Sequence, residues 1–212
     1  MTNYEKKHIP EIRFKGFSNN WNIKKIKDIF NITRGYVLPT ASIQKNKDNN
    51  FIYPVFSSQT LNNGLLGFYN NFLYENALTW TTDGANAGTV KFRKEKFYCT
   101  NVCGVLLEKD EVPNTCISYA LNNIAYKYVS KVGNPKLMNN VMAEINIIIP
   151  QKNEQYKIGN YFHNIDEIIV KITNKLLLIE KYKKRLLNDL LFLFNNRCTK
   201  GNIWHKMSIH YI

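Results

Sequence analysis

The sequence predicts an α+β protein: a globular mixed α/β domain over residues 1–150, followed by a long C-terminal coiled-coil α-helix over 151–194. Three observations lead to this prediction. An apolar fraction of 44%, with 13 Tyr and 12 Phe, is enough for a sizeable core. Up to Pro150, short strand-like runs alternate with turn residues. After Pro150, apolar residues recur at spacings of three and four, which is the period of a helix. The sequence assigns no structure to the tail, 195–212.

Strands are predicted in the first domain wherever β-branched and aromatic residues cluster between turn residues. These runs are 51–57, 65–69, 77–82, 89–93, 97–107 and 145–149. Pro54 predicts an edge position for its strand, because proline has no N–H to donate to a neighbour. The segments 62–64 and 82–88, rich in Asn and Gly, are typical of turns. One helix is predicted over 113–129 from apolar residues at helical spacing.

The long helix is predicted from an apolar stripe that extends over five heptads, with ten of its eleven positions apolar. At about 1.5 Å per residue, the 36 residues from 158 to 193 make a rod of about 54 Å. A second helix is expected to cover this stripe, and packing against the chain's own globular domain is the alternative. Lys183, the polar position of the stripe, either extends its ammonium into solvent or sets the register of the helix pair. The stripe consists of Ile158, Phe162, Ile165, Ile169, Ile172, Leu176, Ile179, Lys183, Leu186, Leu190 and Leu193.

The net charge of the chain is strongly positive. There are 29 Lys and Arg against 16 Asp and Glu, for a formal charge of +13, and the excess is largest over residues 1–50. A charge of this size favours polyanionic partners such as nucleic acid. The alternative is an AT-rich coding sequence, which increases lysine content without a functional reason.

Location and cysteine usage are also indicated by the sequence. No apolar run is long enough to span a membrane, and the first eight residues have no secretory pattern, so a cytoplasmic protein without membrane contact is expected. The four cysteines are too few and too scattered for a disulfide framework. Cys99 and Cys103 are placed on one face of the 97–107 strand, where we interpret them as buried structural thiols.

Sequence patterns of catalysis are missing. The chain has no phosphate-binding loop, no dinucleotide-binding glycine pattern and no Asn-Pro-Pro-aromatic motif of adenine methyltransferases. Lys94-Glu95-Lys96 does not complete a nuclease pattern, and no His pair or second Cys pair at zinc-finger spacing accompanies Cys99 and Cys103. The sequence therefore predicts a non-enzymatic binding protein without a metal site.

Polar loops of the globular domain are the candidate DNA-contacting segments. Arg and Lys pair with the O6 and N7 atoms of guanine, whereas Asn and Gln pair with the N6 and N7 atoms of adenine. Lys91 and Arg93 alternate with apolar residues on a predicted strand, so both belong to one face. The candidate residues are Arg34, Ser57, Ser58, Gln59, Thr60, Asn62, Asn63, Thr82, Asp83, Asn86, Lys91, Arg93, Lys136, Asn139 and Asn140.

Several of these segments, in this order, resemble a known family. The opening Pro10–Phe17 with Trp21 and Lys24–Ile29 is followed by Tyr53–Ser58, by Asn62-Asn63-Gly64 and by Thr82–Thr89. Pro150, Glu154, Gln155 and Ile158 then lead into the heptads. Over about residues 10–194 the chain resembles a target recognition domain and spacer helix of type I restriction-modification specificity subunits.

The resemblance implies a sequence-specific DNA recognition subunit that performs no chemistry. Such subunits bind double-stranded DNA and direct methyltransferase (modification) subunits and a restriction subunit to a bipartite target. The chain itself is then expected to bind no cofactor, because S-adenosylmethionine, ATP and Mg²⁺ belong to the partner subunits. Family members usually carry two recognition domains and two antiparallel spacer helices, whereas this sequence has one of each. A half-size subunit that forms a homodimer through its helix and a truncated product both remain open.

Two rival functions are also considered. The first is a coiled-coil assembly factor of such a complex, without DNA reading of its own. The second is a nuclease with an unrecognised site. Base-specific protection of DNA would exclude the first, and sustained cleavage by the pure chain with Mg²⁺ would favour the second.

Overall fold

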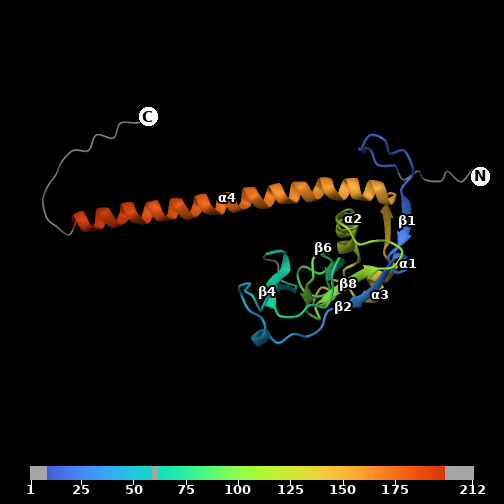
Figure 1. Ribbon diagram of the computed structural model, residues 1–212, viewed down its shortest axis with the longest axis horizontal. Helices are drawn as coiled ribbons and strands as arrows, with labels where there is room; N and C mark the ends of the chain where they lie inside the picture. Colours follow the sequence, from blue (N-terminus) through green and yellow to red (C-terminus); the bar gives the residue numbers. More distant parts are fainter. Residues whose placement is uncertain (1–8, 59–61, 199–212) are drawn as a thin grey trace, which may run out of the picture. The chain divides into compact units, whose positions relative to one another are not determined.

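The computed structural model describes residues 9–58 and 62–198, with side chains for 9–58 and 63–192. The predicted Gln59 and Thr60, the side chains of Asn62 and Leu193, and tail residues 199–212 lie outside this description. The elements, in chain order, are β1 (Asn22–Lys25), α1 (Ile26–Ile29), β2 (Phe30–Arg34), η1 (Thr40–Ser42), β3 (Tyr53–Phe56), η2 (Asn62–Gly64), β4 (Leu65–Tyr69), β5 (Ala77–Thr81), β6 (Val90–Arg93), β7 (Tyr98–Cys99), β8 (Cys103–Glu108), α2 (Thr115–Ala125), η3 (Tyr126–Tyr128), α3 (Asn139–Glu144), β9 (Asn146–Ile149) and α4 (Lys152–Cys198). The α+β class predicted from the sequence is confirmed, with a sheet domain followed by a long C-terminal helix (Figure 1).

The chain divides into two compact units, Met1–His163 and Asn164–Ile212. The predicted boundary at residue 150 marks the end of β9, but the first turns of α4 belong to the globular unit. The reason is packing: Glu154 and Gln155 are only 1% and 2% exposed. A Cβ added at Gly159 would come within 3.3 Å of the Cys116 backbone nitrogen, so α4 and α2 approach closely there.

A four-stranded sheet in the order β2-β8-β5-β6 is the centre of the globular unit. Neighbouring strands are antiparallel, with Arg34 opposite Gly104 and Thr81 opposite Cys103. The ends of β2 and β5 therefore lie beside the start of β8. A three-stranded sheet, β4-β3-β7, and a two-stranded sheet, β1-β9, complete the fold (Figure 1).

Both faces of the four-stranded sheet are covered, which explains the continuous burial of β5. On one face, Leu78 and Trp80 pack in the same apolar cluster as Ile117 and Leu121 of α2. On the other face, Ala77 belongs to a second cluster. That cluster also contains Phe97, Cys99, Cys103 and Val105. Burying apolar surface on both faces is what holds the polar loops at the strand ends in place.

The predicted 97–107 strand is wrong as a single element, because the chain turns between β7 and β8. The Cys103 N–H donates to the Thr100 carbonyl oxygen at 3.0 Å, which closes this turn. Cys99 and Cys103 thus come from different strands, although both are buried in the second cluster. Burial raises the pKa of the Cys103 thiol to about 11, and that of Cys99 also rises, so both stay protonated near neutral pH. Among the described residues, no group of three His, Cys, Asp or Glu could hold a metal ion.

Two other predictions need adjustment. The edge position predicted from Pro54 is wrong, because its strand β3 is the central one of its sheet. The pairing of β3 with β7 begins only at Val55, so the sheet tolerates a proline at position 54 on that side. The helix predicted over 113–129 is shorter, because α2 covers Thr115–Ala125 and a 3₁₀ turn follows. Asn114 caps α2 by accepting a hydrogen bond from the Ile117 N–H at 3.0 Å.

Helix α4 is continuous over 47 residues, or about 70 Å (Figure 1). Two stripe residues, Ile158 and Phe162, belong to the globular unit, where the Phe162 ring lies 4.9 Å from that of Tyr119. In the second unit, the described stripe residues from Ile169 to Leu190, Lys183 included, are exposed within the single chain. No helix in the described part of the chain is long and apolar enough to cross a membrane.

Candidate nucleic-acid interface

Three chain segments meet at one end of the four-stranded sheet. The Gly35 N–H, just after β2, donates to the Cys103 carbonyl oxygen at 2.9 Å. The Thr82 N–H, just after β5, donates to the Val102 carbonyl oxygen at 3.0 Å. The residues that follow Arg34 and Thr81 therefore lie on either side of the start of β8. This end of the sheet is called the loop end.

The end of β3 reaches the same place. The Thr100 N–H donates to the Phe56 carbonyl oxygen, and its hydroxyl donates to Ser57 Oγ, both at 3.0 Å. The Asn86 amide donates to the Ser58 carbonyl oxygen at 3.4 Å. Residues 57–58, which are far from the 82–88 turn in the sequence, thus contact it in the fold.

A third predicted cluster also joins the loop end. The Leu137 N–H donates to the Thr82 carbonyl oxygen at 2.8 Å, and Lys136 Nζ lies 3.8 Å from Asp83 Oδ1. The Asn139 amide donates to the Thr33 carbonyl oxygen at 3.4 Å, next to Arg34. Asn140 follows on the exposed first turn of α3. Four predicted segments that are distant in the sequence are thus brought to one surface.

Lys91 and Arg93 lie on β6, which begins at the loop end with Val90 and runs away from it, so that Arg93 is opposite Ala77, the first residue of β5. Lys91 is opposite Thr79 of β5, so the two cations and the threonines at 79 and 81 belong to one face of the sheet. That face borders a cavity of about 220 Å³. Its polar lining includes Ser57, Asn63, Asn86, Lys91 and Arg93, together with Thr79, Thr81 and Thr89, which the sequence analysis missed. The alternation of apolar and polar residues in Leu78-Thr79-Trp80-Thr81 is the sequence signal that could have found the first two threonines.

The guanidinium of Arg93 is held in place by contacts within the domain, whereas a side chain that reads bases has to reach out to the DNA. Its guanidinium lies 3.6 Å from the centre of the Phe56 ring. Nη2 donates to the Asn63 carbonyl oxygen at 2.7 Å, and Nε donates to Thr79 Oγ1 at 3.3 Å. Burial lowers the pKa of Arg93 to about 10, which still leaves it charged at neutral pH. Arg93 therefore joins β6 to the neighbouring turn while keeping a positive charge at the cavity.

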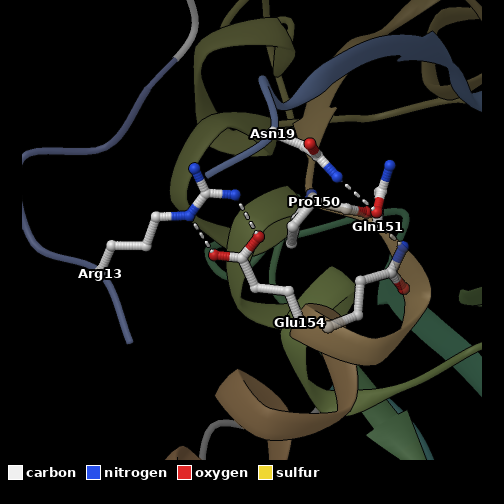
Figure 2. A network of polar contacts seen from close by, with 6 residues as sticks. Arg13, Asn19, Pro150, Gln151 and Glu154 are labelled. Atoms are coloured by element: carbon white, nitrogen blue, oxygen red, sulfur yellow. Dashed lines mark hydrogen bonds and ion pairs between the residues drawn. The ribbon is translucent and has the colours of Figure 1, made fainter. Parts of the chain in front are cut away.

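A separate polar network fixes the start of α4 within the globular unit (Figure 2). Arg13 donates two hydrogen bonds of 2.7 Å to the Glu154 carboxylate, and the Asn19 amide donates to Gln151 at 2.9 Å. The Gln155 amide donates to the Pro150 carbonyl oxygen, also at 2.9 Å. In the sequence, Glu154 and Gln155 mark the passage from the first domain into the helix. In the structure, their side chains take part in this network, which holds the first turns of α4, starting at Lys152, in the globular unit.

The family comparison decides the identity of this arrangement. Residues 18–203 match the family described as "Type I restriction modification DNA specificity domain". The chain belongs to this family. The match covers the β domain and α4 together, and the resemblance predicted from the sequence is confirmed. Specificity subunits are the non-catalytic components of type I systems, which agrees with the prediction that the chain is not an enzyme.

Curated relatives come from Mycoplasma pneumoniae. The chain is 42% identical over 138 residues to the protein named "Putative type I specificity subunit S.MpnORF289P N-terminus", and the match covers 64% of this chain and 72% of that protein. It is 36% identical over 171 residues to the protein named "Putative type I specificity subunit S.MpnORF507P". That match covers 77% of this chain but only 46% of that protein.

A solved structure shares the fold. The S subunit of a type I restriction-modification system from M. genitalium superposes with a TM-score of 0.60 at 22% sequence identity. The superposition covers 73% of this chain and 41% of that subunit. This specificity-domain chain therefore spans less than half the length of the solved subunit, with one recognition domain and one long helix.

Proposed function

We propose that the chain reads DNA sequence for a type I restriction-modification complex, through the loop end of the β2-β8-β5-β6 sheet. One observation carries the proposal: Arg34, Ser57, Asn86, Lys136 and Asn139 come from distant segments yet converge on one end of one sheet. Side chains of these types pair with base edges in the major groove, and a rigid sheet can hold them at fixed spacing.

The exposed stripe of α4 would bring two such reading surfaces together. In our proposal the second helix belongs to another copy of the chain, so that the homodimer rebuilds the two-domain arrangement of longer family members. Two-fold symmetry would then impose a split, palindromic target with half-sites about one DNA turn apart, about 34 Å. A helix of about 70 Å has room for this separation.

The partners would supply the chemistry. The specificity chain would direct methyltransferase subunits, which use S-adenosylmethionine, and a restriction subunit, which uses ATP and Mg²⁺, to the bound sequence. The chain itself would bind double-stranded DNA and none of these cofactors. Its work would take place in the cytoplasm, where chromosomal DNA and these partners are found in bacteria.

The test is selection of bound duplexes from a random pool by the chain in complex with its methyltransferase subunits. Sequencing of the bound fraction should return one enriched, bipartite and palindromic motif, and footprinting should protect both half-sites. A complex that assembles but enriches no motif would favour the assembly-factor alternative. Sustained cleavage of DNA by the pure chain with Mg²⁺ would instead favour a nuclease.

A further inference from the structure

The cavity beside β6 is bordered by two cations that have no anionic partner in the described part of the chain. The ion pairs found there use Arg13, Lys25, Lys27 and Lys136 as their cations. Neither Lys91 nor Arg93 takes part in any of them. Removing a charge from water without a partner of opposite sign is costly, and this cost is greatest for the more enclosed Arg93.

The contacts of Arg93 compensate only part of this cost. The Phe56 ring and the Asn63 carbonyl oxygen are partly negative, but neither carries a full charge. A guanidinium has five N–H donors, and two of its nitrogens are engaged, through Nε and Nη2. Arg93 is thus held in position by the protein while its positive charge remains unneutralised.

The rest of the lining suits an oxyanion. The lining residues include Ser57, Thr81 and Thr89, which carry hydroxyl groups, and Asn63 and Asn86, which carry side-chain amides. The Ser57 oxygen already accepts from the Thr100 hydroxyl, so its own hydrogen is left to donate. Among the described residues of the lining there is no carboxylate that would repel an anion.

We propose that this cavity binds a phosphate group, with Arg93 and Lys91 as its cationic ligands. Phosphate oxygens are accepted by guanidinium, ammonium and hydroxyl donors together, and charge-assisted hydrogen bonds are the strong ones. A neutral group such as an extruded base could enter about 220 Å³, but it would leave both cations without a counter-charge. The phosphate is either one of the DNA backbone, in which case the inference rests on the proposed function, or a free phosphate or nucleotide.

The first experiment uses inorganic phosphate as the probe. Calorimetric titration of the full chain, against chloride at equal ionic strength, should show saturable binding at one site. Lys91→Gln removes one unit charge from an exposed strand position and should weaken phosphate binding about five-fold or more. The matched control Lys24→Gln removes the same charge from an exposed position on β1, away from the cavity lining, and should change the affinity less than two-fold. Thr81→Val, which removes a lining hydroxyl at nearly constant volume, is the second cavity variant and should also weaken binding.

The second experiment identifies the source of the phosphate. Single phosphates of a bound duplex are replaced by neutral methylphosphonates. If the DNA backbone fills the cavity, one replacement weakens binding by the wild-type chain and by Lys24→Gln but has no further effect on Lys91→Gln. If a free phosphate or nucleotide fills it, phosphate binds as above, while no methylphosphonate shows this dependence on Lys91.

Two outcomes distinguish phosphate binding in the cavity from sequence-specific DNA binding by the chain. Sequence-specific DNA binding that no methylphosphonate couples to Lys91, together with no binding of inorganic phosphate, would overturn the cavity assignment and leave DNA reading intact. Phosphate binding that is lost in Lys91→Gln, without any sequence-specific DNA binding, would support the cavity and overturn the DNA-reading proposal.

Discussion

The two units of this chain treat the same residue types in opposite ways. In β5 and α2, Leu78 and Leu121 are 0% exposed, whereas Leu176 and Ile172 of α4 are 55% and 63% exposed. The globular unit thus covers its own apolar surface, and its polar loops are free to contact a ligand. The second unit leaves a regular apolar stripe uncovered, which isolated helices in water do not tolerate well. The difference teaches that the described part of the first unit buries its own apolar residues, whereas the described stripe of the second unit stays exposed within the single chain, which is the observation behind the proposed pairing.

The largest effect is expected from Ile172→Asp, a charge in the middle of the exposed stripe. If two copies pair through α4, burying this carboxylate against apolar neighbours should lower dimer affinity by 100-fold or more, about 3 kcal/mol. Analytical ultracentrifugation across a concentration series measures the change. The matched control is Val170→Asp, which is 51% exposed but lies off the stripe and should leave the mass unchanged. Equal sedimentation of wild type and Ile172→Asp would contradict the homodimer.

A pair of identical substitutions sharpens the comparison of the two units. Leu121→Ala removes a fully buried side chain next to Ile117 and should lower the free energy of unfolding by about 3 kcal/mol. Leu176→Ala removes an exposed one and should change the free energy of unfolding of the monomer by less than about 0.5 kcal/mol. Urea denaturation, monitored for the globular unit at a concentration where the chain is monomeric, gives both values. Similar losses in the two variants would mean that the stripe is already covered within the single chain.

Loss of the pair at the start of α4 should weaken the attachment of that helix. Arg13→Gln leaves the buried Glu154 carboxylate without its two charge-assisted hydrogen bonds, and the melting temperature should fall. Lys15→Gln, an exposed charge removal two residues away, is the control and should have little effect. Arg13→Gln combined with Glu154→Gln should recover part of the loss, because no unpaired carboxylate remains. A melting temperature unaffected by Arg13→Gln would show that the contact in Figure 2 contributes no stability.

The smallest effect is expected at the loop end. If Lys136 contacts one DNA phosphate, Lys136→Gln should reduce the slope of log affinity against log salt concentration by about 0.9. The slope for Lys24→Gln, whose position is distant from the loop end, should stay at the wild-type value. Fluorescence anisotropy with a labelled duplex at several salt concentrations measures both slopes. An affinity of the wild-type chain that does not change with salt would contradict DNA binding as a whole.

Local patterns predicted the elements well where the local signal is strong. The run 65–69 forms β4 with the predicted bounds, and the stripe after Pro150 lies on one continuous helix. The turn at Thr100–Val102 was missed because its one turn-forming residue, Asn101, lies between the strand formers Thr100 and Val102, and the hydrogen bond from Cys103 to Thr100 reveals it. Strands β1 and β2 were also missed, because both are short and the isoleucines from Ile23 to Ile32 recur every three residues, a spacing that does not indicate a strand.

The candidate interface was predicted only residue by residue. Arg and Asn in turns are visible in a sequence, but their meeting depends on strand order β2-β8-β5-β6, and pairings such as Arg34 with Gly104 join residues 70 positions apart. The role of Arg93 shows the same limit: alternation places it on one face of β6, while its contact with Phe56 depends on how the two sheets pack.

The sequence by itself determined the class of the protein, the long helix and its apolar stripe, because helical period and composition are local properties that each segment carries alone. Only the tertiary structure decided that four distant loops share one end of a sheet, and that two cations border a cavity whose described lining residues include no carboxylate. Strand register and sheet packing create those neighbours, and they arise from the burial of apolar surface over the whole domain rather than from any single segment.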